Sequence, residues 1–148
     1  MDYGSIEREL HIDASPEVVF DVVSSPEHLK EWWPDEAEYP AVPGGAGRIG
    51  FGENWVQFQV VDAVPHQLFS FWWAHAEGEQ PAADNSFLVV FSLEPAGEGT
   101  RLRMTETGFR EHGWDEAKIV AEYEDHVSGW DFFLPRIPGY AAKLGARS

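Results

Sequence analysis

The spacing of apolar residues limits the folds that this chain can adopt. Up to about residue 109, outside residues 15–33, most apolar residues alternate with polar ones, which predicts β-strands. Beyond residue 115 the apolar residues recur every third or fourth position, which predicts a long helix. Sequential strands followed by one helix favour an antiparallel sheet with the helix across one face, an α+β fold. The helical positions are Ile119, Tyr123, Val127, Trp130, Phe133, Leu134 and Ile137.

Five segments read as strands, and proline- and glycine-containing turns separate them. They are residues 5–13, 55–65, 67–74, 85–96 and 99–109, and the glycine-rich stretch 43–52 reads as a turn entering a further strand at Arg48. That stretch lacks the Gly-Lys-Ser/Thr ending and the following helix of a phosphate-binding loop. We expect the acidic, proline-bounded segment 34–40 to be a loop.

Two short helices are predicted between the first strand and this loop. Ser15-Pro16 and Ser25-Pro26 each place a helix-capping residue before a proline at the first helical position. In the C-terminal helix, Pro135 and Pro138 predict a break after Leu134.

Composition narrows the function further. The chain has 148 residues, a length that fits one domain, and a formal net charge of −16, which disfavours binding to a phosphate backbone. It has no cysteine, and therefore no disulfide or thiolate chemistry. No secretory signal or membrane span is evident, so we expect a cytoplasmic protein that does not contact nucleic acid or membrane. No motif indicates a cofactor.

With this element order, several motifs resemble the START/Bet v 1-like (SRPBCC) superfamily. They are "IDASPEVVFDVVSSPEHLKEWWP", "PGGAGRIGFG", "GEGTRLRMTETGF" and "GWDFFLPRI". The branch they resemble is named after the C-terminal domain of the activator of Hsp90 ATPase, and the similarity covers about residues 6–144 of a single 1–148 domain. The resemblance implies a helix-grip fold, in which a curved sheet wraps a long helix around a deep apolar cavity. It also implies binding of lipids, hormones or polyketides, with cyclase or hydrolase activity in some members.

Strand alternation predicts which side chains would line that cavity, since every second residue shares a face. Together with the helix and the loop after the double tryptophan, it gives a set of candidate ligand-binding residues. They are Trp33, Tyr39, Phe51, Phe58, Phe71, Trp73, Phe91, Met104, Glu106, Tyr123, His126 and Trp130. One ring of the Trp32-Trp33 pair is expected to contact the pocket or its mouth, and the other to pack the second helix onto the sheet. The position before Pro34 favours Trp33 for the pocket, and the reverse assignment stays open.

Three titratable residues are candidates for chemistry. The alternation along strand 99–109 places Glu106 on the inward face, where a buried carboxylate needs a partner. A position in water at the rim of the cavity fits the sequence as well. His126 titrates near neutral pH and lies four residues after Glu122 on the predicted helix. The three could form an acid/base or metal site, or His126 could be a satisfied core residue or part of a surface ion pair. No second nearby histidine completes a metal triad, and we predict no metal.

Three functions remain open from the sequence. The first is binding of a small hydrophobic molecule, aromatic, acyl or polyketide-like, in the cavity. The second is a polyketide cyclase/dehydratase-like or hydrolase-like enzyme that uses His126 or Glu106 for proton transfer. The third is a protein-interaction, co-chaperone-like domain. A homodimer formed through a sheet edge is also possible.

Overall fold

One curved sheet and one interrupted C-terminal helix dominate the molecule. The computed structural model describes residues 3–146. The elements are β1 (Ser5–Ile12), α1 (Pro16–Ser24), α2 (Pro26–Leu29), β2 (Glu36–Glu38), β3 (Ala46–Phe51), β4 (Asn54–Val64), β5 (Leu68–Trp73), β6 (Phe87–Ala96), β7 (Gly99–Thr107), η1 (Arg110–His112), α3 (Glu116–Phe133), η2 (Leu134–Arg136) and α4 (Ile137–Ala146).

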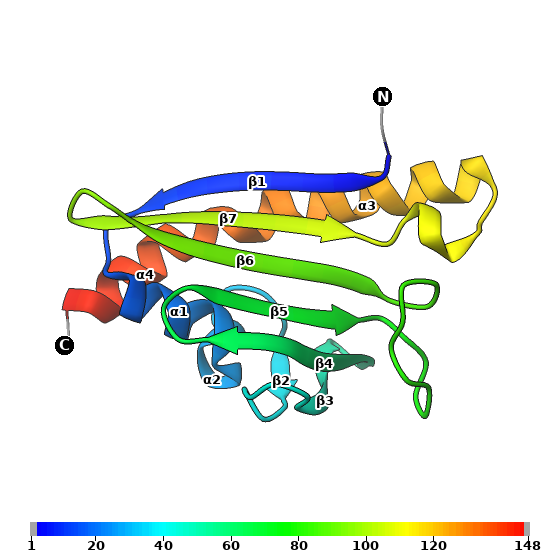
Figure 1. Cartoon of the computed structure of the whole chain (residues 1–148), viewed down its shortest axis with the longest axis horizontal. Helices are drawn as coiled ribbons and strands as arrows, with labels where there is room; N and C mark the ends of the chain where they lie inside the picture. The colour runs from blue at the N-terminus through cyan, green and yellow to red at the C-terminus, as the bar shows by residue number, and fades with distance from the viewer. Residues whose placement is uncertain (1–2, 147–148) are drawn as a thin grey trace.

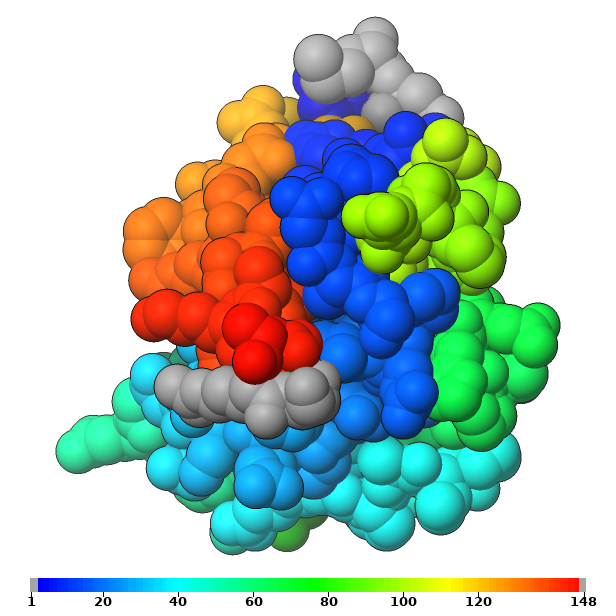
Figure 2. Space-filling view, turned by 90° about the vertical axis from the view of Figure 1, so that its left-hand side faces the viewer, coloured from blue at the N-terminus to red at the C-terminus, as the bar shows by residue number. Residues whose placement is uncertain are grey.

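The strands form a single antiparallel sheet in the order β1-β7-β6-β5-β4-β3-β2. The helices α3 and α4 run behind this sheet, with α1 and α2 beside them at one end (Figure 1). Seen from that end, α3 and α4 (orange to red) form one side of the molecule and the β4–β5 and β6–β7 turns (green, yellow-green) lie on the other (Figure 2). This is the α+β helix-grip arrangement that the sequence predicts.

The predicted alternation is confirmed along the central strands. In β6 the residues at positions 87, 89, 91 and 93 are buried, and the intervening residues are more exposed. In β7 the buried residues Leu102, Met104 and Glu106 alternate with more exposed neighbours. One face of the sheet therefore supplies the core, and Glu106 belongs to that face.

The C-terminal helix begins and breaks where its sequence requires. The Asp115 side chain caps α3 by accepting a hydrogen bond from the Lys118 backbone N–H at 2.9 Å. The helix ends at Phe133, a 3₁₀ turn that contains Pro135 follows, and α4 resumes at Ile137. The break predicted near Leu134 is confirmed.

Two local predictions were wrong. Part of the predicted 34–40 loop forms β2, which pairs with β3 through Glu36–Gly50, Ala37–Ile49 and Glu38–Arg48. Its three residues carry too little alternation to mark a strand. Ser25 precedes Pro26 at the start of α2, but its side chain makes no capping hydrogen bond, unlike Ser15, which accepts from Val18 N–H at 3.3 Å.

Aromatic rings fill most of the space between sheet and helices. Phe58 stacks on Tyr39 and on Phe71, with ring centroids 4.3 Å apart in each pair. Trp32 is fully buried, meets Phe91 edge-on, and donates its indole N–H to the Val22 carbonyl at 2.9 Å. The deep cavity that the family resemblance implies is therefore largely occupied by side chains at this end of the fold.

We predict that Trp32→Ala lowers the free energy of unfolding by about 3–5 kcal/mol, because it leaves a large void and an unpaired Val22 carbonyl. Trp55→Ala is the matched control, since Trp55 is 40% exposed and its main contact is the Arg48 guanidinium over its ring. The control should cost less than about 1 kcal/mol. Urea denaturation of both variants measures the difference, and equal losses would contradict this account of the core.

Candidate functional site

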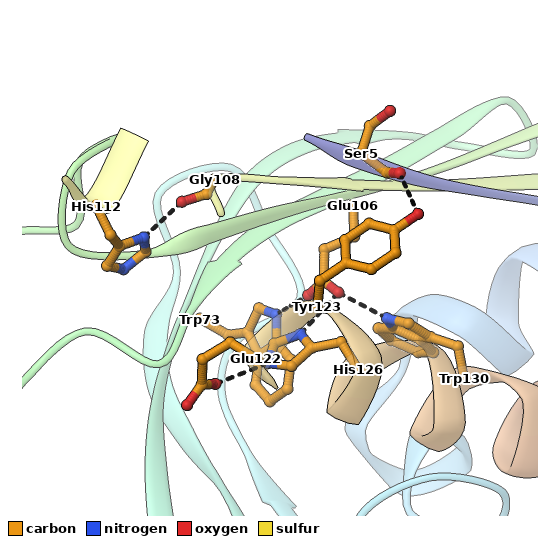
Figure 3. Close-up of polar contacts among 9 residues, drawn as sticks. All are labelled: Ser5, Trp73, Glu106, Gly108, His112, Glu122, Tyr123, His126 and Trp130. Atoms are coloured by element: carbon orange, nitrogen blue, oxygen red, sulfur yellow. Dashed lines mark hydrogen bonds and ion pairs between the residues drawn. The ribbon is translucent and has the colours of Figure 1, made fainter. Parts of the chain in front are cut away.

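A buried carboxylate joins the sheet to α3. Glu106 is fully buried, and three N–H groups point at it (Figure 3). Its Oε2 accepts from the Trp73 indole at 2.8 Å, and its Oε1 meets the Trp130 indole and His126 Nδ1, each at 2.8 Å. Indole nitrogens only donate, so this arrangement matches an ionised carboxylate. The alternative position of Glu106 in water at the rim is wrong.

The strand order explains why these groups meet. Glu106 lies near the end of β7, an inner strand of the sheet. Its backbone pairs with Ile6 of β1 on one side and with Val89 of β6 on the other. Trp73 is the last residue of β5, which is separated from β7 by β6. Its indole reaches the Glu106 carboxylate from that side. His126 and Trp130 are four residues apart and so share one face of α3 above the carboxylate.

The hydrogen bond to Glu106 sets the orientation of His126. With an ionised Glu106, Nδ1 must carry a proton and donate it, which leaves Nε2 free to exchange a proton. Nε2 lies 3.8 Å from Glu122 Oε2. Burial acts to lower the pKa of His126, but the hydrogen bond and attraction from Glu106, with weaker attraction from Glu122 and Asp125, outweigh it and raise the pKa above its ordinary value.

His126 borders a pocket of about 350 Å³ between the sheet and α3. The sheet side comes from β3 to β6, the opposite wall comes from α3, and Trp33 enters from the segment after α2. The lining residues are Trp33, Phe51, Val56, Trp73, Ala74, Phe87, Glu122, Asp125, His126, Gly129, Trp130 and Phe133. The pocket is thus mainly aromatic, with the polar groups on the helix side.

Trp33 is the centre of the aromatic wall. Its ring centroid lies 4.9 Å from Trp130, 5.1 Å from Trp73 and 5.9 Å from Phe51. Trp32, its neighbour, stacks on it from the core side at 6.0 Å. The two adjacent tryptophans therefore divide in the way the sequence suggests, with Trp33 at the pocket and Trp32 in the core.

The structure gathers only part of the predicted ligand-binding set at this pocket. Trp33, Phe51, Trp73, His126 and Trp130 line it, and Glu106 lies directly beneath three of them. The remaining members lie elsewhere: Tyr39, Phe58, Phe71, Phe91, Met104 and Tyr123.

Two of those residues have clear structural roles. Tyr39 does not border the pocket; it is buried and donates its hydroxyl to the Ser24 carbonyl at 2.6 Å. Tyr123 faces β1 and donates to the Ser5 carbonyl at 2.9 Å (Figure 3). The four other side chains pack within the core.

The helical spacing contains a signal that sequence reasoning did not use. The pocket residues of α3 follow a single stripe with three- and four-residue steps. They are Glu122, Asp125, His126, Gly129, Trp130 and Phe133. Extending the stripe from His126 in both directions would have added Asp125, Gly129 and Phe133 to the candidates. Phe87 pairs with Trp73 across β5 and β6, and this position brings it to the pocket.

A larger open cleft of about 850 Å³ lies beside β3, β4 and the segment after β5. Arg48, Trp55 and His75 are among its lining residues, and His75 Nδ1 is buried without a hydrogen-bond partner in the described structure. Burial lowers the pKa of His75. This cleft is wide and has no buried network of polar groups comparable to that around Glu106, so we assign the functional site to the smaller pocket.

Neither a metal centre nor a membrane span is found among residues 3–146. No group of three or more His, Cys, Asp or Glu side chains in this range could hold a metal ion. Over the same residues, no helix combines the length and apolar character needed to cross a bilayer.

The sheet, the broken C-terminal helix and the pocket between them define a Bet v 1-like helix-grip domain. Residues 13–142 match the family described as Activator of Hsp90 ATPase homolog 1-like protein, and the chain belongs to this family. A search of curated protein sequences finds no match.

Solved structures share the fold at low sequence identity. Protein MLL2253 from Mesorhizobium loti is 20% identical with a TM-score of 0.74, over 94% of this chain and 97% of that one. The Aha1 dimer from Colwellia psychrerythraea is 23% identical with a TM-score of 0.69, over 90% and 92%. DynU16, a putative protein in the dynemicin biosynthetic locus, is 19% identical with a TM-score of 0.70, over 96% of this chain and 48% of that one.

We predict that the His126–Glu106 pair stabilises the fold most at low pH. The pKa of His126 is raised in the folded protein above its ordinary value of 6.5. The stabilisation is complete below about pH 6.5 and is lost as the pH rises through the folded-state pKa. NMR titration of His126 measures that pKa, and urea denaturation from about pH 6 to 9 measures the loss.

Two variants separate the partners of His126. Glu106→Gln should lower the His126 pKa and flatten this part of the pH dependence, because it removes the main hydrogen-bonding charge. Glu122→Gln should lower the pKa less, because Glu122 is farther away and partly exposed. A wild-type His126 that titrates below its ordinary pKa, or that responds more to Glu122→Gln than to Glu106→Gln, would contradict the arrangement.

Proposed function

We propose that this protein binds a small hydrophobic molecule, aromatic or acyl, in the pocket between the sheet and α3. The observation that carries the proposal is the lining, in which six aromatic side chains surround one oriented histidine. A volume of about 350 Å³ lies within the range of small-molecule pockets, roughly 300–1,000 Å³. A mainly apolar wall with few polar groups is typical of such sites.

The size of the pocket limits the ligand. Burying roughly 200 Å² of apolar ligand surface would contribute about 5 kcal/mol before the costs of association. The aromatic walls favour a flat group that can stack on Trp33, Trp73 or Trp130. His126 can donate a hydrogen bond from Nε2 when protonated, which suits a hydroxyl or carbonyl oxygen on the ligand.

Gly129 gives a direct test of the pocket. It lines the pocket from within α3, and a Cβ built on it meets nothing within 4 Å. We predict that Gly129→Leu fills the pocket and weakens binding of 2-naphthol, a neutral aromatic probe, by tenfold or more. Calorimetry and quenching of tryptophan fluorescence would measure the affinity.

Gly139→Leu is the matched control for this substitution. Gly139 lies in α4, where a Cβ also meets nothing within 4 Å, and it does not line the pocket. Both variants replace a helical glycine with leucine, so both should gain helix propensity, and only Gly129→Leu should lose the probe. Equal affinities in the two variants would move the binding site away from this pocket.

A second candidate function is proton transfer of the cyclase/dehydratase type. The Glu106–His126 hydrogen bond favours it, because it fixes the imidazole with Nε2 at the pocket. Neutral Nε2 would take a proton from a carbon next to a ligand carbonyl, and the imidazolium would return it to a leaving hydroxyl. DynU16, from a biosynthetic locus, shares the fold, which is consistent with small-molecule chemistry on this scaffold.

The pH profile distinguishes an enzyme from a binding protein. We predict that dehydration of a small β-hydroxy ketone to the enone and water, followed by mass spectrometry, rises as His126 loses its proton, above its ordinary pKa. His126→Gln should remove turnover while 2-naphthol still binds, and Glu124→Gln, on the exposed side of the same helix, should change neither. A β-hydroxy ketone dehydrated equally by the wild type and His126→Gln would exclude this role.

Other sequence-based hypotheses stay predictions. A homodimer through a sheet edge would use β1 or β2, the outer strands of the sheet. The Colwellia structure, described as a dimer, gives a reason to measure the oligomeric state. A protein-interaction role predicts partner binding that persists in Gly129→Leu, because the pocket would then not be needed.

A further inference from the structure

We propose that the preferred ligand carries a positive charge: an organic amine or quaternary ammonium whose apolar body occupies the pocket and whose cationic group lies at its acidic edge. This inference rests on the proposed binding function and specifies its ligand class. It follows from the charges on the helix side of the pocket and from the rings next to them.

The charges that border the pocket are unbalanced. Glu122 and Asp125 both line it, and the lining contains no lysine or arginine. Glu106 and protonated His126 form a hydrogen-bonded pair whose two charges cancel. The pocket therefore has a net negative potential from Glu122 and Asp125, and neutral His126 would make that potential stronger.

The surrounding helix adds to this potential. The acidic residues of α3 outnumber its single lysine, Lys118, whose ammonium lies 4.5 Å from the Trp114 ring centroid. The acidic residues are Glu116, Glu122, Glu124, Asp125 and Asp131. Asp131 forms a salt bridge with Arg8, so it contributes little net field. The Arg136 guanidinium, which is outside the lining, lies 5.3 Å from the Phe133 ring centroid.

Aromatic faces lie where a cation attracted to Glu122 would be placed. The Glu122 carboxylate is 3.8 Å from His126 Nε2, and the His126 ring lies 4.5 Å from Phe87 and 5.4 Å from Trp73 by centroid. The negative face of an aromatic ring attracts organic cations, and aromatic cages recognise quaternary ammonium groups. Carboxylate and rings therefore act on the same part of the pocket.

The same arrangement acts against anionic ligands. A fatty-acid or aryl carboxylate in this pocket would face Glu122 and Asp125, and the one basic lining residue, His126, already has Glu106 and Glu122 as its partners. Desolvating a carboxylate that would have to compete for its partner is unfavourable. The formal charge of −16 on the whole chain favours cations at longer range as well.

Three probes with one naphthalene body separate charge from shape. They are 2-naphthylmethyl-trimethylammonium, 2-naphthylmethanol and 2-naphthoate. We expect the cation to bind at least about tenfold more tightly than the alcohol, and the carboxylate to bind more weakly than the alcohol. The preference for the cation should decrease as the salt concentration rises from about 20 to 500 mM.

Charge-neutral variants assign the effect to the pocket edge. Glu122→Gln with Asp125→Asn should remove most of the preference for the cation, measured as the ratio of the cation's affinity to the alcohol's in the same variant. The control is Glu124→Gln, which removes a charge from the same helix at an exposed position outside the lining. Glu124→Gln should retain most of the preference.

The outcomes distinguish this inference from the proposed function. If the alcohol binds and Gly129→Leu prevents it, but the cation binds no more tightly, the pocket is confirmed and the cation preference is rejected. If the preference persists in the Glu122→Gln/Asp125→Asn variant, the assignment to these two carboxylates is rejected. If none of the three probes binds, the proposed binding function fails with it.

Discussion

The hydrogen bonds to Glu106 connect the elements on which the site depends. One carboxylate receives N–H groups from β5 and from two positions on α3, while its own backbone pairs in the interior of the sheet. An ionised group in the core is costly unless such donors surround it. Trp73, His126 and Trp130 meet that cost, and in doing so they fix the distance between the sheet and the helix. The pocket is the space that this spacing leaves open above His126.

Aromatic packing determines which part of the space between the sheet and the helices stays open. Towards α1 and α2 the stack of Tyr39, Phe58 and Phe71 fills the interior, with Trp32 packed beside Phe91. Close packing of this kind leaves few voids larger than a water molecule. The helix offers Gly129 rather than a larger side chain where α3 passes the pocket. The family fold alone therefore implies a cavity, but the individual rings set its position and size.

The sequence predicted the parts of this structure that follow a regular period. Strand alternation turned Glu106 inward, and helical spacing put His126 on the sheet side of α3. The indole partners of Glu106 were not predictable, because Trp73 and Trp130 are 33 and 24 residues away from it in sequence and meet only in the folded sheet and helix. Tyr39, a candidate ligand-binding residue, packs in the core instead, and its hydroxyl partner, the Ser24 carbonyl, is a backbone group with no sequence signal.

Stability alone does not account for a charged pair in this core. The pair contributes pH-dependent stability, but apolar groups of similar volume at a buried ion pair are often equally or more stabilising. The hydrogen bond between Glu106 and His126 selects one imidazole tautomer and leaves Nε2 3.8 Å from the Glu122 carboxylate, which also lines the pocket. A binding protein gains from this an oriented polar contact beside aromatic walls. An enzyme would gain a base whose proton affinity is set by Glu106, and both uses depend on the same three atoms, Glu106 Oε1 and the two ring nitrogens of His126.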